Sequence, residues 1–185
     1  MAKWRWLEQI TDHEQLVRLK VIENVPLFAG LSRRQLGKLL VKFFEKEYRP
    51  GETIFTEGEP GKALFIVLTG SVLICRALHE GEENLATLGA GSYFGELALI
   101  DDQPRFASAR AAELSLLLIL YRSDFEDLME GQRTLAIQVM GNLLKTLAGY
   151  VRRAQSQRNG RNSVIAAPAA VVDETMMTSK MVSRD

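Results

Sequence analysis

Short apolar runs separated by glycines fill the chain from Glu52 to Tyr121, and this pattern constrains the fold more than any other feature of the sequence. The runs that we expect to form strands are Thr53–Thr56, Ala63–Leu68, Val72–Arg76, Leu85–Leu88, Ala107–Ala111 and Leu114–Tyr121. The glycines between them supply the positive-φ turns that tight chain reversals need. Strands this short and this regularly interrupted predict a small antiparallel barrel or jelly roll.

Helical patterns precede this region. Apolar residues recur at helical spacing over Arg5–Val25. The segment Ser32–Gln35 has the composition of a capping box and opens a second helix. We expect this second helix to carry Phe43 and Phe44 on its buried side and to end near residues 49–51, where Arg-Pro-Gly stops it.

Helical patterns also follow the strands. Ser123–Glu126 reads as a second capping box, and apolar residues then recur at three- and four-residue spacing over Arg133–Ala154. The fold class that follows is α+β, an antiparallel β-roll (jelly roll) flanked by N-terminal helices and a long C-terminal helix. We expect a helical segment over 1–24, the binding domain over 25–155, and a disordered tail over 156–185, where no period is visible.

Composition narrows the classes of function. At 185 residues the chain is long enough for one domain with a core of its own. Lys plus Arg and Asp plus Glu balance at 23 each, which gives no bulk electrostatic reason to expect nucleic acid or a membrane as partner. We see no secretory signal, no apolar stretch near the roughly 18 residues of a membrane span, and a single cysteine, Cys75. We therefore expect a cytoplasmic protein without a metal site.

The residues that carry chemistry lie between Phe94 and Ala111. Gly95 opens a tight turn followed by a helix start, whose backbone amides suit an anion. Arg105 follows a rigid proline and can bind a phosphate in forked geometry, and Ser108 can donate a hydroxyl to the same site. Glu96 repels a phosphate but can accept a hydrogen bond from a sugar hydroxyl. The combination fits a nucleotide better than free phosphate.

The stretch Phe94-Gly-Glu-Leu-Ala-Leu99, followed by four residues and then Pro104-Arg105, closely resembles the phosphate-binding cassette of the cyclic-nucleotide-binding domain family. The resemblance extends over roughly residues 22–155. It implies a cyclic nucleotide as ligand, with Glu96 on the ribose 2′-hydroxyl and Arg105 on the cyclic phosphate, and neither a cofactor nor a metal. The ligand-binding residues that it implies are Gly95, Glu96, Leu97, Ala98, Arg105, Phe106, Ala107 and Ser108.

Phe106 departs from the family pattern, which usually has Ala, Ser or Thr after the arginine. In relatives that prefer cGMP, a threonine at this place donates a hydroxyl to the guanine, and a phenylalanine cannot do so. The resemblance therefore implies cAMP as the ligand of choice. The alternatives are that the Phe106 ring crowds the phosphate or stacks on a different base.

Several residues have a second interpretation. Arg105 can form a surface ion pair with Asp101 or Asp102 in the adjoining loop instead of binding phosphate. The apolar stripe of the long helix can pack on the β-roll, or it can join two subunits as in relatives of the catabolite activator type. On the same helix, Asn142 and Thr146 are polar residues that can reach a nucleobase.

Three functions are consistent with these patterns. The first is a sensor or regulatory module that binds a cyclic nucleotide and moves its C-terminal helix against an unidentified protein partner. The second is a transcription regulator, which we do not expect because no helix-turn-helix pattern follows Gln155. The third is a ligand-free interaction module in which Phe106 fills the pocket. An enzyme is the least expected class, because no triad, metal set or paired general acid and base is visible.

Overall fold

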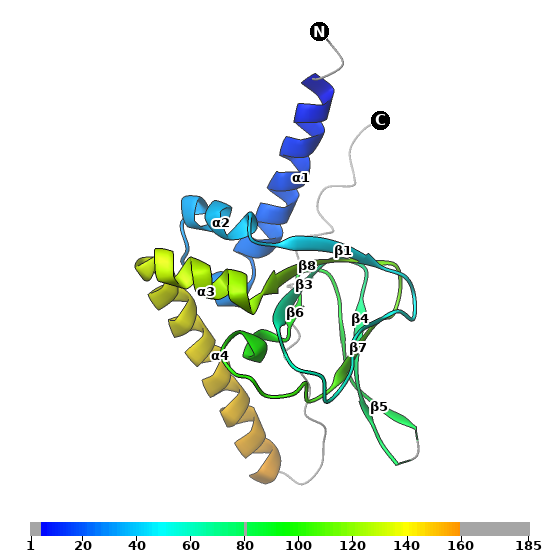
Figure 1. Cartoon of the computed structure of the whole chain (residues 1–185). Helices are drawn as coiled ribbons and strands as arrows, with labels where there is room; N and C mark the ends of the chain where they lie inside the picture. The colour runs from blue at the N-terminus through cyan, green and yellow to red at the C-terminus, as the bar shows by residue number, and fades with distance from the viewer. Residues whose placement is uncertain (1–4, 80, 160–185) are drawn as a thin grey trace, which may run out of the picture.

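The computed structural model describes residues 5–79 and 81–159, and over these residues the strands form two four-stranded antiparallel sheets (Figure 1). One sheet has the order β1-β8-β3-β6 and the other the order β2-β7-β4-β5. The strands are β1 Phe44–Tyr48, β2 Thr53–Phe55, β3 Ala63–Thr69, β4 Val72–Ala77, β5 Glu82–Leu88, β6 Tyr93–Phe94, β7 Ser108–Ala111 and β8 Ser115–Tyr121. The predicted antiparallel β-roll with flanking helices is confirmed.

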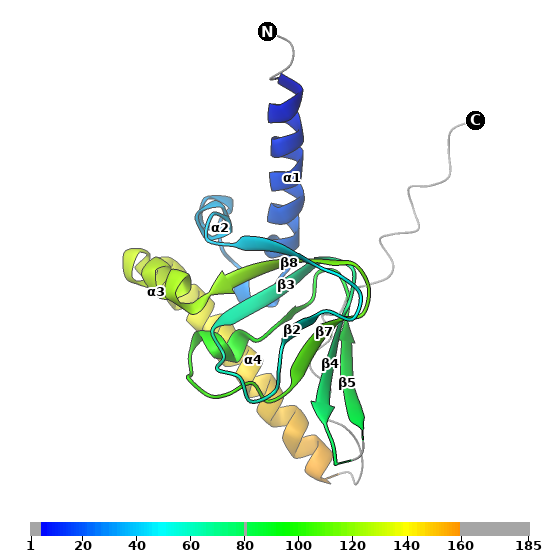
Figure 2. The same cartoon turned by 45° about the vertical axis from the view of Figure 1, so that its right-hand side comes forward.

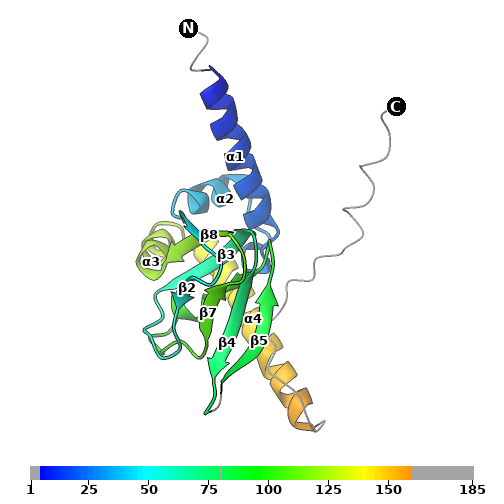
Figure 3. The same ribbon diagram turned by 90° about the vertical axis from the view of Figure 1, so that its right-hand side faces the viewer.

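The helices gather on one side of the roll. They are α1 Arg5–Glu23, η1 Pro26–Phe28, α2 Arg33–Leu40, η2 Glu96–Leu99, α3 Arg122–Gly131 and α4 Arg133–Asn159. Figures 2 and 3 show that α1 projects from one end of the roll, while α4 runs along its side and extends past the opposite end. This course carries α4 beyond the helical core and along the wall of the roll.

The central strands β3 and β8 are buried on both faces, which explains why their sequences are almost continuously apolar. In β3, Leu64 and Ile66 face the helices, whereas Phe65 and Val67 face the interior of the roll. The alternation follows from the two-residue period of a strand. The sheet β1-β8-β3-β6 therefore separates two apolar clusters.

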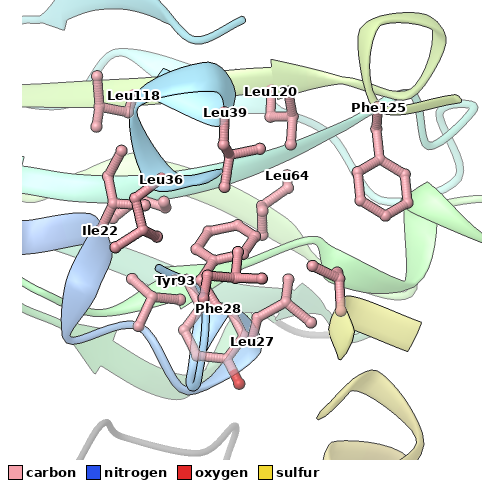
Figure 4. Close-up of a cluster of buried hydrophobic side chains, with 14 of the residues drawn as sticks. Ile22, Leu27, Phe28, Leu36, Leu39, Leu64, Tyr93, Leu118, Leu120 and Phe125 are labelled. Carbon is pink, nitrogen blue, oxygen red and sulfur yellow. The ribbon is translucent and has the colours of Figure 1, made fainter. Parts of the chain in front are cut away.

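The first cluster lies between this sheet and the helices. Its members include Ile22, Leu27, Phe28, Leu36, Leu39, Leu64, Tyr93, Leu118, Leu120 and Phe125, whose side chains point toward one another in Figure 4. They come from α1, η1, α2, α3 and four strand positions of one sheet. The second cluster fills the interior of the roll with residues of both sheets, among them Phe65, Ile74, Leu88, Phe94 and Ala109.

The second helix begins where the sequence predicts. The Ser32 hydroxyl accepts a hydrogen bond from the Gln35 amide at 3.3 Å, and the Gln35 side chain accepts one from the Ser32 amide at 2.9 Å. Its predicted end near residues 49–51 is wrong, because α2 stops at Leu40 and residues 44–48 form β1. Phe44 pairs with Ile119 of β8 and is 60% exposed, so it does not lie on a buried helix face.

Two further predictions differ from the structure at helix ends. The Ser123–Glu126 capping box is wrong, since α3 already begins at Arg122 and Tyr121 occupies its N-cap position without a side-chain hydrogen bond. The last helix continues to Asn159, four residues past the predicted boundary at 155. The remainder of the predicted disordered tail, from residue 160, lies outside the described residues.

Candidate functional site

Gly95 makes the turn that connects β6 to η2. Its φ of +76° lies in the left-handed region, which residues other than glycine rarely adopt. A Cβ atom at this position would lie 2.7 Å from Nη1 of Arg105 and 3.0 Å from the carbonyl oxygen of Ala63. The glycine is therefore needed both for the turn and for the close approach of the arginine.

Arg105 points into the roll, not into the solvent. Its Nη2 donates a hydrogen bond to the Ala63 carbonyl at 2.9 Å, and its Nη1 donates a longer one to the Gly95 carbonyl at 3.4 Å. The guanidinium carbon lies 4.1 Å from the centroid of the Phe55 ring and 5.7 Å from that of Phe65. These contacts place a cation on the aromatic floor of the roll.

The charge of Arg105 has no close counter-ion in the part of the chain that the structure describes. No carboxylate there lies within 4 Å of the guanidinium, and the buried Nε atom has no hydrogen-bond partner. Burial lowers the pKa of Arg105, against the opposing charges of Glu59 and Glu96. The alternative ion pair is wrong, since Asp102 contacts Arg122 instead. A half-buried guanidinium with a free donor can bind an anion.

Glu96 is the carboxylate of the site and is only 6% exposed. Its Oε1 accepts a hydrogen bond from the hydroxyl of Tyr150, which belongs to α4. Burial raises the pKa of Glu96, while the Tyr150 hydrogen bond and the charge of Arg105 act in the opposite direction. Burial and the neighbouring Glu96 raise the pKa of Tyr150. This contact joins the cassette to the last helix, over 54 residues of sequence.

A cavity of about 490 Å³ opens beside these groups. This volume is within the range of small-molecule sites, roughly 300–1,000 Å³. Its wall is mostly apolar and comes from three places: the interior of the roll, the cassette, and the C-terminal half of α4. The α4 residues in this wall are Tyr150, Val151, Arg153 and Ala154, and the roll contributes Phe55, Ile74, Leu85, Tyr93 and Phe94.

Seven of the eight predicted ligand-binding residues line this cavity. They are Gly95, Glu96, Leu97, Ala98, Arg105, Phe106 and Ala107. Ser108 does not line it, and its hydroxyl accepts a hydrogen bond from the Glu57 amide at 2.9 Å. Ala107 and Ala109 are buried on the inner face, so the strand period turns Ser108 to the other face.

Phe106 lies at the rim of the cavity and does not fill it. The residue is 53% exposed although it belongs to the lining. Its carbonyl oxygen accepts hydrogen bonds from Nε and Nη2 of Arg76 at 3.3 and 3.2 Å. These bonds fix the backbone of Phe106 to β4, at the edge of the site.

The two polar residues expected on the last helix have different surroundings. The structure does not bring Asn142 to the cavity: its side chain is buried and donates hydrogen bonds to the carbonyls of Leu27 and Ala29 at 3.1 and 2.8 Å. It therefore fastens α4 to η1. Thr146 does not line the cavity either, but it lies beside Tyr93. Burial raises the pKa of Tyr93, and the hydrogen bond with the Thr146 side chain acts in the opposite direction.

Sequence reasoning missed the residues through which α4 reaches the site. Tyr150 lies eight residues after Asn142, which is about 12 Å along a helix at 1.5 Å per residue. Arg153 follows on the same side, with its guanidinium carbon 5.1 Å from the centroid of the Tyr150 ring. A tyrosine and an arginine three residues apart were visible in the sequence, but the point at which the helix crosses the cavity was not.

Among residues 5–79 and 81–159, no group of three or more His, Cys, Asp or Glu side chains is arranged to hold a metal ion. None of the helices in the same ranges combines the length and apolar character of a membrane span.

Comparison with known proteins gives one consistent picture. A family model described as a cyclic nucleotide-binding domain matches residues 45–132. The cyclic AMP receptor protein of Thermus thermophilus is 40% identical over 134 residues, which are 72% of this chain and 60% of that protein. The cAMP-dependent protein kinase regulatory subunit of Mycosarcoma maydis is 30% identical over 166 residues, or 89% of this chain and 30% of that protein.

A solved structure has the same architecture. The crystal structure of the Thermus thermophilus catabolite activator protein superposes with a TM-score of 0.66 at 37% identity, over 72% of this chain and 62% of that chain. This chain spans 60% of the first of the two sequence relatives and 30% of the second. The similarity therefore concerns the β-roll and its helices.

Proposed function

Residues 45–132 belong to the cyclic-nucleotide-binding domain family, and on this premise we propose that the cavity between the cassette and α4 binds cAMP. In this proposal the chain is a regulatory module that senses its ligand and performs no reaction on it. The names of its relatives support the choice of ligand, since one is a cyclic AMP receptor protein and another the regulatory subunit of a cAMP-dependent kinase.

The observation that carries the proposal is the state of Arg105. Within the described residues its buried Nε has no hydrogen-bond partner and no carboxylate pairs with the guanidinium, which borders the cavity. A cyclic phosphate carries one negative charge and two free oxygens, which a forked guanidinium binds well. Phosphate binding would supply the missing partner and offset the cost of burying the cation.

Glu96 supports the choice of a nucleotide over free phosphate. One oxygen of its carboxylate accepts the Tyr150 hydroxyl, which leaves the other for a second donor. The ribose 2′-hydroxyl is a donor of the right kind. Because Glu96 is buried, a hydrogen bond to it is stronger than it would be in water.

Phe106 supports adenine over guanine. The side chain at this position lies at the rim and offers no hydroxyl or amide to the purine edge. The Phe106 ring is half exposed, so the interaction-module alternative, in which this ring fills the cavity, has no support from its position.

The regulatory step in this proposal is a movement of α4. Ligand in the cavity would contact the wall formed by Tyr150 and Arg153, and would compete for or add to the Glu96 hydrogen bond. A ligand shifts a conformational equilibrium only if it binds the two arrangements with different affinity. The partner that receives the signal, and the predicted cytoplasmic location, stay predictions.

We also propose that α4 joins two copies of the chain. Ile137, Met140, Leu144 and Val151 are exposed on this helix, and with Leu147 they follow the alternating three- and four-residue spacing of a helix seam. Leu144 is 67% exposed although it is apolar. Sedimentation equilibrium should give a dimer for the wild type and a monomer for Leu144→Glu.

Isothermal titration tests the proposed ligand directly. We expect cAMP to bind at one site per chain and cGMP to bind more weakly. Arg105→Leu should lose about 2–5 kcal/mol of binding free energy, as expected when one partner of a buried charged contact is truncated. Arg18→Leu is the matched control, because Arg18 pairs with Glu45 on the β1 side of the molecule and does not line the cavity.

The control should bind cAMP like the wild type. A wild-type protein that releases no heat and gains no thermal stability with millimolar cAMP would contradict the proposed function. Binding that survives Arg105→Leu unchanged would move the ligand to another site.

A further inference from the structure

Arg122, the first residue of α3, makes a set of contacts that the proposed ligand site does not explain. Its Nε donates a hydrogen bond to the Ala98 carbonyl at 2.5 Å, and its Nη2 donates one to the Gly61 carbonyl at 2.9 Å. The same Nη2 contacts the carbonyl of Asp101, and Nη1 contacts the carboxylate of Asp102. The backbone amide of Arg122 is bonded as well, to Lys62.

Three of these four acceptors are backbone carbonyls of segments that wall the cavity. Gly61, Ala98 and Asp101 all line it, whereas Arg122 does not. Ala98 lies in η2, two residues after Glu96, and Asp101 begins the loop that leads to Arg105. Arg122 therefore contacts the cassette between its two ligand-binding side chains.

Gly61 belongs to a second loop, which joins β2 to β3 and is tied to the cassette along its length. The Gly58 amide donates to the Arg105 carbonyl, and the Arg105 amide donates to the Glu59 carbonyl, each at 2.8 Å. A Cβ atom on Gly61 would lie 2.9 Å from that of Ala98, so the two loops are in close contact. Arg122 bonds to both loops, through the carbonyls of Gly61 and Ala98, at the start of α3.

Burial distinguishes Arg122 from the surface arginines. Its side chain is 16% exposed, whereas that of its acidic partner Asp102 is 94% exposed. The contact with Asp102 contributes little because water screens it. The carbonyls of Gly61, Ala98 and Asp101 matter more, since they would lose a charged donor if Arg122 were removed. A guanidinium offers five donors in a rigid planar fork, whereas a lysine ammonium offers three donors on one freely rotating nitrogen.

We propose that Arg122 is a positioning residue for the phosphate site. It holds Ala98 and Asp101 at the start of α3, and through them sets the separation of Glu96 and Arg105, without touching the ligand itself. The inference rests on the proposed function for its effect on affinity, but its effect on the cassette backbone is independent of any ligand. It also ties the cassette to the first residue of the helical unit α3–α4, at a point remote from the Tyr150 contact.

The experiment compares Arg122→Gln, Arg122→Lys and the control Arg18→Gln by amide hydrogen exchange in the ligand-free protein and by titration with cAMP. In Arg122→Gln we expect exchange over residues 96–105 to accelerate about tenfold, because local opening of this segment becomes easier, while the β4–β5 hairpin keeps its rates. The dissociation constant for cAMP should rise about tenfold in Arg122→Gln. For Arg122→Lys, both the exchange rates and the dissociation constant should lie between those of the wild type and those of Arg122→Gln. Arg18→Gln should change neither quantity.

Two results would overturn the inference. One is unchanged exchange over residues 96–105 in Arg122→Gln. The other is equal acceleration of this segment and of the β4–β5 hairpin, which would make Arg122 a contributor to global stability only. If the wild type does not bind cAMP, the proposed function fails, and hydrogen exchange still decides whether Arg122 positions the cassette.

Discussion

The two faces of the sheet β1-β8-β3-β6 have opposite properties. On the helix side, Leu64, Leu118 and Leu120 pack against leucines and phenylalanines of α1, α2 and α3. On the roll side, Phe65 and Leu117 also face an apolar cluster, but that cluster borders a cavity of about 490 Å³ with a buried carboxylate and a half-buried guanidinium.

The two faces differ in what they contribute: the helix side contributes to stability, and the roll side holds the proposed ligand site. Burial of apolar surface is the dominant favourable term in folding, and the helix side supplies it without an ionisable cost. On the roll side, burial raises the pKa of Glu96 and lowers the pKa of Arg105, so that the neutral form of each group is favoured. One sheet therefore separates the apolar cluster under the helices from the ionisable groups of the proposed ligand site.

Leu120→Ala should have the largest effect, and it should act on stability alone. Leu120 is fully buried on the helix side, so its truncation should lower the free energy of unfolding by about 2–5 kcal/mol. The affinity of the folded protein for cAMP should not change. Denaturant unfolding and isothermal titration measure the two quantities.

Leu114→Ala is the matched control for this change. Leu114 is 57% exposed, and its truncation should alter the free energy of unfolding by less than about 0.5 kcal/mol. A Leu120→Ala protein that is stable but binds cAMP much more weakly would break the division between the two faces.

Glu96→Gln should act on the roll side in two ways. It should weaken cAMP binding by about 2 kcal/mol, because the ribose hydroxyl loses a charged acceptor. It should also change the pH dependence of stability. Burial raises the pKa of folded Glu96 above its ordinary value near 4.5, so the folded state of the wild type binds this proton more tightly than the unfolded state.

The sign of the pH effect follows from that difference. The contribution of Glu96 to the stability of the wild type is most favourable at low pH and is lost as the pH rises from about 4.5 through the raised pKa. Relative to the wild type, Glu96→Gln should therefore gain stability at neutral pH and lose this slope. Urea unfolding at several pH values checks it, and parallel curves for the two proteins would contradict the burial of an ionised carboxylate.

The sequence was informative where the chemistry is local. Gly95, Glu96 and Arg105 lie within eleven residues. A positive-φ turn at a glycine, a carboxylate and an arginine that follows a proline can all be predicted from the sequence alone, because each depends on neighbouring residues. The prediction that Ser108 lines the site differs from the structure, and the strand period explains why. A strand that turns Ala107 inward must turn the next residue outward.

The parts that depend on tertiary packing could not be predicted. Residues 44–48 carry no decisive local signal, and the pairing of Phe44 and its neighbours with β8 makes them a strand. Asn142 was expected near a nucleobase, but the docking of η1 beneath α4 gives it two backbone carbonyls instead. Tyr150 reaches Glu96 only because of the angle at which α4 crosses the roll.

Tyr150→Phe should have the smallest effect, and it should act on one half of α4 only. The N-terminal half of the helix is held by buried Leu135, Val139 and Leu143, whereas the Tyr150 hydroxyl joins the other half to the cassette. Loss of this hydrogen bond should cost about 1 kcal/mol of stability. Hydrogen exchange should accelerate over residues 146–156 and stay unchanged over 135–143, and equal changes in both halves would show that the helix responds as one rigid unit.

The NMR signal of the Arg105 Nε–H group, assigned by its absence from the spectrum of Arg105→Lys, reports directly on the proposed contact between Arg105 and the phosphate. In the ligand-free protein this donor is buried and has no partner among the described residues. Saturation with cAMP should move its proton resonance downfield as the phosphate accepts the hydrogen bond. Saturable binding of cAMP that leaves this resonance in place would contradict the assignment of the phosphate to Arg105.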